Sequence, residues 1–193
     1  MDIQQITKDA EAGDMEAQWN LSNMYYQGDD ITKDDEKAFY WVSKAAAQGH
    51  TYSQFNLGCM HYHGKATSQD YAKAFFWFSL AAEKGHASAQ NNLGVMYRDG
   101  IGVDEDFEEA FIWFLIASNS SLTCCYDSRR SYYGNPNAEC NLGLMYIKGQ
   151  GVPESKSRAA HWINLAYIQG SERATELLDE YKLWDDIQKY YFI

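Results

Sequence analysis

The pentapeptide CMHYH, residues 59–63, holds the densest group of side chains that could bind a metal ion. Cys59 and His63 are four residues apart and therefore share one face of a helix, as zinc ligands can. His61 lies two residues from each of them and points away from that face. Because zinc is held by three or four protein ligands and the spacing supplies no third one, we expect no metal site and no cofactor.

Covalent and acid–base catalysis find no support in the sequence. A serine followed three residues later by lysine, the nucleophile arrangement of penicillin-interacting enzymes, occurs nowhere in the sequence. The acidic runs at 29–30 and 104–106 fall at expected turns, where we expect the carboxylates either to lie in a solvated loop or to stabilise a helix N-terminus. We therefore expect no catalytic residues, and a small hydrolase or metal-dependent enzyme is the less favoured alternative.

Charge and composition narrow the possible partners. The 193 residues include 27 acidic and 16 basic side chains, which give a net charge of −11 at pH 7. This charge repels nucleic acid and anionic membranes and attracts basic proteins. The first residues do not resemble a secretory signal, no apolar run approaches the roughly 18 residues that span a bilayer, and the cysteine spacing is not that of a disulfide framework. We expect a cytoplasmic protein that binds neither nucleic acid nor membranes.

The elements that position these residues belong to a repeat. Tryptophan, leucine, methionine, glycine and two alanines each recur four times with steps of 36, 36 and 49 residues. The marking tryptophans are Trp41, Trp77, Trp113 and Trp162. The repeats span about 14–49, 50–85, 86–121 and 135–170, and an insertion at 118–135 separates the third from the fourth.

Each repeat predicts two amphipathic helices joined at a glycine. Leu21 and Met24 lie on one stripe of the first helix, and Ala38 and Trp41 lie on one stripe of the second. Such a hairpin cannot bury its apolar faces alone, so neighbouring hairpins must stack on it. We predict an all-α fold, a right-handed α-solenoid of four helix-turn-helix repeats that forms a single domain over 1–193.

Two further features complete the predicted fold. A small residue recurs inside the first helix, at Ser22, Gly58, Gly94 and Gly143. Because glycine costs a helix about 1 kcal/mol relative to alanine, we expect the two helices of a pair to cross closely there. The apolar residues after Gly170 recur at helical intervals and predict a C-terminal capping helix over 171–193.

The segment AQNNLGVMYRDGIGVDEDFEEAFIWFLIA, residues 89–117, follows the pattern A-x-x-x-L-G-x-M-Y-x-x-G, then G-V, then A-x-x-W-x-x-x-A. The pattern resembles the Sel-one-like repeat, a relative of the tetratricopeptide repeat, and the resemblance covers roughly residues 10–170. Ser22, His61 and Ser121 depart from it. The resemblance implies an adaptor fold that serves protein recognition in signalling, secretion or virulence.

Tetratricopeptide-like solenoids line their concave face with the first helix of each pair, and positions opposite the packing stripe are therefore candidates for recognition. This stripe comprises Trp19, Asn23, Tyr26, Phe55, Cys59, Tyr62, Asn91, Val95, Arg98, Cys140, Leu144 and Ile147. The predicted partner-binding residues within it are Trp19, Asn23, Tyr26, Phe55, Tyr62 and Arg98. Aromatic residues and arginine dominate interface energetics, and the stripe varies from copy to copy as a recognition surface does. Packing between repeats is the alternative role of Trp19 and Phe55.

The insertion is the second predicted contact. It concentrates Tyr126, Arg129, Arg130, Tyr132 and Tyr133. The arginines could bind a carboxylate or phosphate on a partner, and the alternative is a mobile loop whose charges pair with neighbouring acids.

The predicted function is a non-enzymatic module that holds a basic partner protein in its concave groove and through the insertion. A concrete version is an immunity protein that neutralises a basic toxin. The alternative is an adaptor or scaffold in bacterial signalling or secretion.

Overall fold

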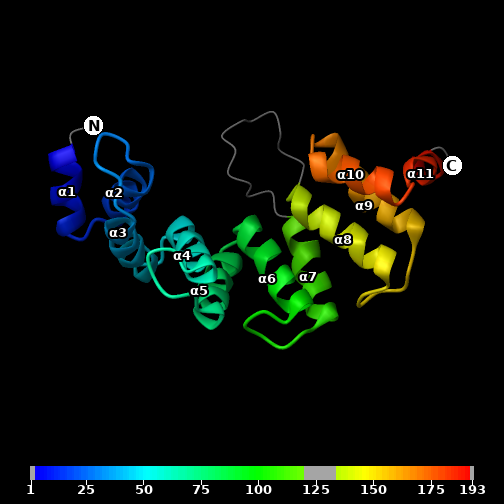
Figure 1. The fold of residues 1–193 in the computed structure, drawn as a ribbon, viewed down its shortest axis with the longest axis horizontal. Helices are drawn as coiled ribbons and strands as arrows, with labels where there is room; N and C mark the ends of the chain where they lie inside the picture. The colour runs from blue at the N-terminus through cyan, green and yellow to red at the C-terminus, as the bar shows by residue number, and fades with distance from the viewer. Residues whose placement is uncertain (1–2, 120–133, 192–193) are drawn as a thin grey trace. The chain divides into compact units, whose positions relative to one another are not determined.

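A computed structural model describes residues 3–119 and 134–191 (Figure 1). Within these ranges all regular structure is α-helical, which confirms the predicted all-α class of stacked helix pairs. The protein forms two compact units, residues 1–84 and 85–193. The helices of the first unit are α1 (Ile3–Glu11), α2 (Met15–Gln27), α3 (Asp35–Ala47), α4 (Thr51–His63) and α5 (Tyr71–Glu83). Those of the second are α6 (Ala87–Asp99), α7 (Phe107–Asn119), α8 (Pro136–Lys148), α9 (Lys156–Ile168), α10 (Glu172–Glu180) and α11 (Trp184–Tyr191).

The predicted pairs are α2–α3, α4–α5, α6–α7 and α8–α9, and each of these helices is 13 residues long. The recurring glycine ends the first helix of a pair in the left-handed region, with φ of 84° at Gly28 and 64° at Gly100. Its N–H donates to the carbonyl of the recurring methionine, Met24 or Met96. The glycine column therefore marks a backbone requirement.

Aspartate side chains begin three of the four second helices, and Ser155 begins the fourth. Of the two acidic runs placed at turns, 104–106 supplies one of these caps through Asp106, whereas Asp29 and Asp30 lie before α3 and do not cap it. The side chains of Asp34 and Asp70 accept hydrogen bonds from the backbone N–H groups of Lys37 and Lys73. Asp106 accepts in the same way from the first turn of α7. These hydrogen bonds satisfy N–H groups that a helix cannot satisfy internally.

The small residues inside the first helices mark close crossings, which confirms the prediction. A Cβ atom at Gly58 would lie 2.6 Å from the ring of Phe78, and one at Gly94 would lie 2.6 Å from the ring of Phe114. Phe78 and Phe114 are almost fully buried. The lost helix propensity at these glycines is offset by the packing of a large aromatic ring.

Histidine begins two of the first helices. His50 Nδ1 accepts a hydrogen bond from the backbone N–H of Ser53 at 3.2 Å, and His86 accepts similarly from Ala89. An imidazolium ring cannot accept at Nδ1, so this cap requires neutral histidine. Burial lowers the pKa of His50 below its ordinary value, although Glu16 opposes the effect.

His50→Asn is expected to remove part of the acid sensitivity of the fold, because Asn135 already caps α8 at the equivalent position. With a lowered pKa in the folded state, the capping contribution of His50 is present above about pH 6.5 and is lost as the pH falls through the folded-state pKa. Urea unfolding at pH 7.5 and 5.0 should show a difference between the two pH values that is smaller in the variant by about 1 kcal/mol. His63→Asn, on the exposed end of α4, is the control; an equal effect there would contradict a role for the cap.

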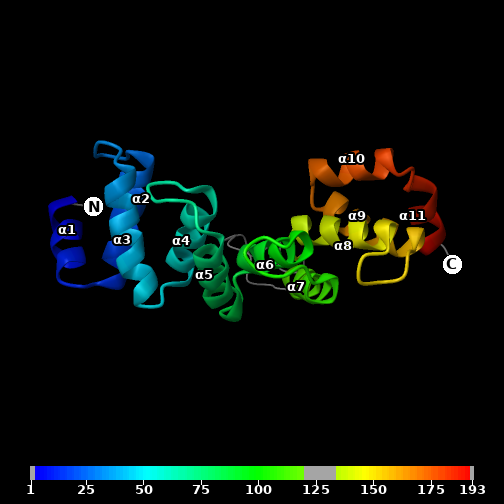
Figure 2. The ribbon, with the colours of Figure 1, turned by 60° about the horizontal axis from the view of Figure 1, so that its bottom comes forward.

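The segment after the fourth pair corrects one expectation. It forms two helices, α10 and α11, where one capping helix over 171–193 was predicted. Lys182 adopts φ of 55°, which ends α10, and Leu183 becomes fully buried and donates its N–H to the carbonyl of Leu178. In Figure 2, α10 runs beside α8 and α9, and α11 packs against α9. The break allows both short helices to cover the last pair.

Candidate functional site

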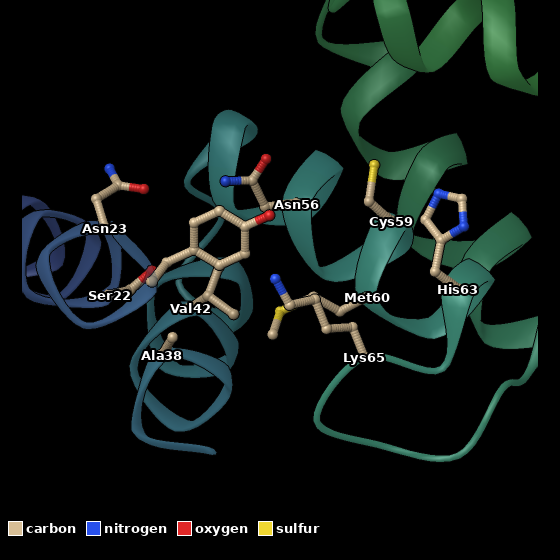
Figure 3. A pocket seen from close by; sticks show the side chains of 10 residues that line it. Ser22, Asn23, Ala38, Val42, Asn56, Cys59, Met60, His63 and Lys65 are labelled. Atoms are coloured by element: carbon tan, nitrogen blue, oxygen red, sulfur yellow. The ribbon is translucent and has the colours of Figure 1, made fainter. Parts of the chain in front are cut away.

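A cavity of about 340 Å³ opens between α2, α3 and α4 in the first unit (Figure 3). The residues that line it are Ser22, Asn23, Tyr26, Ala38, Val42, Asn56, Cys59, Met60, His63 and Lys65. Its lining combines a small apolar floor with several polar side chains, the combination that is typical of ligand sites in proteins.

The cavity forms where the first repeat carries one smaller side chain, that of Val42, than the next two repeats. Val42 stands 36 residues before Phe78, and Phe78 stands 36 before Phe114. The two phenylalanine rings fill the space over Gly58 and Gly94. Valine is too short to fill the corresponding space in the first repeat, where Ala38 and Met60 also contribute to the lining.

Two asparagine amides lie at this cavity. Asn23 comes from α2 and Asn56 from α4, and both are half-buried (Figure 3). Neither of these amides makes a hydrogen bond to another residue in the described part of the protein. A side-chain amide offers both donors and an acceptor, which match the N–H and C=O groups of a peptide backbone.

Tyr26 supplies an exposed aromatic ring, 45% exposed, at the same cavity. The ammonium group of Lys65 lies 3.9 Å from the centroid of this ring and 3.6 Å from a carboxylate oxygen of Asp35. The cation–π contact and the ion pair together hold the Lys65 side chain at the cavity.

Cys59 and His63 both line the cavity, as their shared helix face predicts. Burial raises the pKa of the Cys59 thiol to about 11, so the thiol stays protonated at neutral pH and is a poor nucleophile. His61 points elsewhere: it is buried and packs edge-on against Phe39, in the slot that tyrosine takes in the other repeats. Within residues 3–119 and 134–187, no three His, Cys, Asp or Glu side chains are grouped so that they could hold a metal ion.

The structure thus brings together Asn23 and Tyr26 from the predicted partner-binding set, with Cys59 from the same stripe. Trp19, Phe55 and Tyr62 lie outside the cavity lining.

Those three side chains make ring contacts within the first unit. Trp19 lies 5.0 Å from the ring of His50, and Phe55 and Tyr62 lie 5.8 and 6.4 Å from the ring of Phe78. These contacts match the packing role that was the alternative for Trp19 and Phe55.

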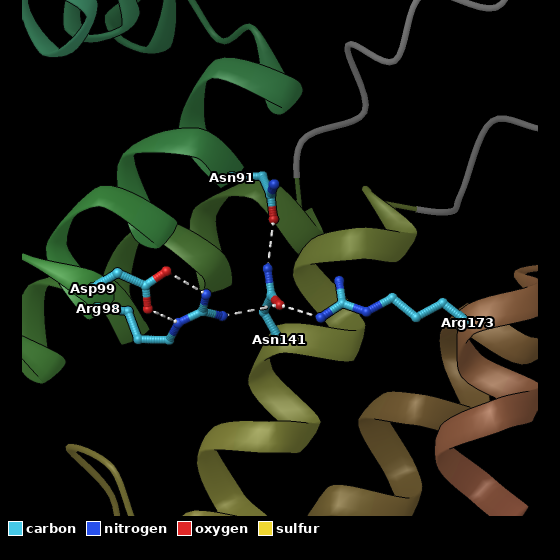
Figure 4. Close-up of polar contacts among 5 residues, drawn as sticks. All are labelled: Asn91, Arg98, Asp99, Asn141 and Arg173. Atoms are coloured by element: carbon cyan, nitrogen blue, oxygen red, sulfur yellow. Dashed lines mark hydrogen bonds and ion pairs between the residues drawn. The ribbon is translucent and has the colours of Figure 1, made fainter. Parts of the chain in front are cut away.

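Arg98, the predicted partner-binding residue of the second unit, makes hydrogen bonds to other residues of the protein. It donates to the carboxylate of Asp99 at 2.6 and 2.8 Å and to the Asn141 side chain at 3.3 Å (Figure 4). The predicted insertion residues Tyr126, Arg129, Arg130, Tyr132 and Tyr133 lie outside the described residues.

Asn56, His63 and Lys65 were not among the predicted partner-binding residues. One sequence feature could have indicated Asn56, because asparagine recurs at the same place in all four repeats. The column is Asn20, Asn56, Asn92 and Asn141. A constant polar residue next to a buried leucine indicates a position with a demanding hydrogen-bonding role.

Comparison with known proteins gives a family and related structures. Residues 16–50, 51–86, 87–122 and 136–171 each match the Sel1 repeat. A solved structure of c5321, described as a protective antigen present in uropathogenic Escherichia coli strains displaying an SLR fold, is 34% identical over 92% of the present sequence, with a TM-score of 0.81. A Sel1 repeat protein from Oxalobacter formigenes is 29% identical over 88% of the present sequence, with a TM-score of 0.74.

The matched region spans 35% of the first of these proteins and 64% of the second. A comparison with curated proteins gave no match. None of the described helices has the length and apolar character that crossing a membrane requires.

Proposed function

The chain belongs to the Sel1 repeat family, and from this premise we propose that it is a non-catalytic module that holds a partner protein at the cavity of its first unit. Sel1 repeat arrays are typically protein-interaction scaffolds and are usually non-catalytic. The observation that supports this site is the cavity itself, because the protein's own second and third repeats fill the corresponding space over Gly58 and Gly94 with phenylalanine.

An extended peptide segment fits the chemistry of the lining. Ala38, Val42 and Met60 can receive one apolar side chain. Asn23 and Asn56 can pair with the backbone on either side of it. The exposed ring of Tyr26 adds the kind of aromatic contact that carries much of the binding energy at interfaces.

The charge of the protein favours a basic partner. The net charge is −11, and Asp29 and Asp30 follow the C-cap Gly28 of α2 as exposed side chains without an ion pair to any described residue. Association with a basic protein is then faster at low salt and weakens as salt rises.

In its most specific form, the proposal is an immunity protein that neutralises a basic toxin in the cytoplasm, with the insertion at 118–135 as a second contact. An adaptor or scaffold in bacterial signalling or secretion is the alternative. A scaffold differs from an inhibitor in having two separable binding surfaces.

The double variant Ser22→Gly, Val42→Phe tests the site. It installs the glycine–phenylalanine pair that the second and third repeats already use, so the cavity is filled while the packing remains native-like. With the wild-type protein as bait, we expect affinity capture from the native cells, followed by quantitative mass spectrometry, to recover a basic protein. Titration with that protein should show at least about tenfold weaker binding to the double variant.

Tyr40→Ala is the matched control, because it removes an exposed ring of α3 that does not line the cavity. It should bind the partner as the wild type does. Equal binding by the filled variant, with an unchanged melting temperature, would rule out the cavity as the contact. Capture of acidic proteins alone would contradict the charge part of the proposal.

A further inference from the structure

Asn141, on α8, is the centre of a polar cluster in the second unit (Figure 4). Its Nδ2 donates to Oδ1 of Asn91 at 3.0 Å, and its Oδ1 accepts from Nη2 of Arg173 at 2.9 Å and from Nη1 of Arg98 at 3.3 Å. The four residues come from α6, α8 and α10. Asn141 is 2% exposed and Asn91 is 9% exposed, so burial restricts the positions of the two amides that lie beside the guanidinium groups.

The positive charge of this cluster is only half compensated. Both guanidinium groups lie within hydrogen-bond distance of one neutral oxygen atom, which places like charges beside each other. Arg98 is paired with the carboxylate of Asp99 at 2.6 Å. Arg173 has no carboxylate within ion-pair distance in the described part of the protein. An additional anion would lower the electrostatic energy of this arrangement.

The hydrogen-bonding groups that remain are donors. The Oδ1 atoms of Asn91 and Asn141 already accept hydrogen bonds. The Nδ2 of Asn91 donates to no described residue, and Arg173 uses one of its donor nitrogens on Asn141. A ligand that fits such a cluster must bring acceptors and negative charge.

We propose that the cluster of Asn91, Arg98, Asn141 and Arg173 binds a carboxylate group of a peptide ligand, either the side-chain group of an acidic residue or the terminal α-carboxylate. The planar guanidinium of Arg173 presents parallel N–H donors that match the two oxygens of a carboxylate. Nδ2 of Asn91 supplies a neutral donor on the same cluster. The site stands on the second unit alone and is independent of the cavity in the first.

The asparagine column supports a ligand-facing role for this position. Asn56, which precedes Asn141 by two repeats, lies at the cavity of the first unit. At the position of Arg98, the first two repeats carry Tyr26 and Tyr62. The second unit therefore carries an arginine, Arg98, at the repeat position where the first unit carries tyrosine.

The experiment is a side-chain NMR titration of the ¹⁵N-labelled full-length protein at constant ionic strength. The probes are N-acetylglycine, which mimics the terminal α-carboxylate of a peptide, and N-acetylaspartic acid α-amide, which mimics an acidic side chain. Sodium phosphate and sodium chloride are the comparison anions. We expect saturable shifts of the Arg173 Nε–H and Asn91 Nδ2–H₂ signals with at least one carboxylate probe. The probe that binds more tightly identifies whether the carboxylate comes from a peptide terminus or from an acidic side chain.

Arg173→Gln keeps a donor for Asn141 and should lower the affinity of the protein for the carboxylate probe at least about fivefold. Arg158→Gln is the control, because it removes the same charge from an exposed position on α9 outside the cluster. Asn91→Asp keeps the acceptor for Asn141 and adds a negative charge, so it should abolish probe binding and raise the melting temperature of the free protein.

Shifts that do not saturate, or that chloride reproduces, would overturn the site. Equal weakening by Arg158→Gln and Arg173→Gln would do the same. Binding of phosphate at least tenfold tighter than either carboxylate would overturn the assignment of the ligand as a carboxylate.

Discussion

Replacing Gly94 by serine is expected to lower the free energy of unfolding by about 2 kcal/mol. A Cβ atom at this position would lie 2.6 Å from Cδ1 and Cε1 of Phe114, and that ring is fully buried. The ring cannot move away without leaving its packed site, so the cost exceeds the gain of about 0.5 kcal/mol in helix propensity over glycine. Urea denaturation followed by circular dichroism measures the change.

The first repeat offers a compensating pair for this variant. It combines Ser22 with Val42, so Gly94→Ser, Phe114→Val recreates a combination that already exists in the fold. We expect the double variant to be more stable than the sum of the two single changes predicts, by at least about 1 kcal/mol. Strictly additive changes would show that the contact between Gly94 and Phe114 does not limit the size of residue 94.

Glu139→Gln is expected to raise the free energy of unfolding by about 2 kcal/mol at pH 8 and by much less at pH 5. Glu139 is 2% exposed and accepts a hydrogen bond from Gln169 at 2.6 Å. Burial raises its pKa to about 7, against an ordinary value of 4.5. The folded state therefore binds a proton more tightly than the unfolded state, and stability is lost as the pH rises through about 7.

The other repeats explain why glutamine should be better at this position. The column is Gln18, Gln54, Gln90 and Glu139. Gln18 accepts from Gln48 as Glu139 accepts from Gln169, and its amide also donates to the carbonyl of Ala10 at 3.0 Å. The carboxyl group of a glutamate can donate a hydrogen bond of this second kind only when it is protonated.

Two further variants separate this effect from a general change in charge. Glu176→Gln, at an exposed position on α10, removes the same charge and should change stability little at either pH. Gln54→Glu introduces a buried carboxyl group into the first unit and should lower stability at pH 8 more than at pH 5. A gain for Glu139→Gln that is equal at both pH values would contradict a buried ionisable carboxyl group as its cause.

Much of the fold could be predicted because its determinants are local. The helix pairs follow from apolar periodicity, and the turns follow from the recurring glycine. The close crossing at Gly94 follows from a glycine where alanine would favour the helix. The division of 171–193 into two helices could not be predicted in this way, because Leu178, Tyr181 and Trp184 keep helical spacing across the break. The burial of Leu183 determines the break between the two helices, and that burial depends on the packing of α10 and α11 against α9.

The candidate site could be predicted only in part. Helical geometry places Asn23 and Tyr26 opposite the packing stripe, and the structure finds both at the cavity. The cavity itself depends on the difference in size between Val42 and Phe78. The sequence shows this difference, but it does not show which residues surround each of the two side chains. Arg173 lies on α10, beyond the four repeats, so no comparison of repeat columns could have placed it beside Asn141.

Within each unit, helices pack chiefly against helices that are near them in sequence. Contacts of this kind close short loops, which favours rapid and local acquisition of structure. During synthesis, α1 to α5 can therefore make their native contacts as soon as α5 leaves the ribosome, without waiting for α6 to α11. We expect nascent polypeptides to form the cavity between α2, α3 and α4 while the later repeats are still being translated.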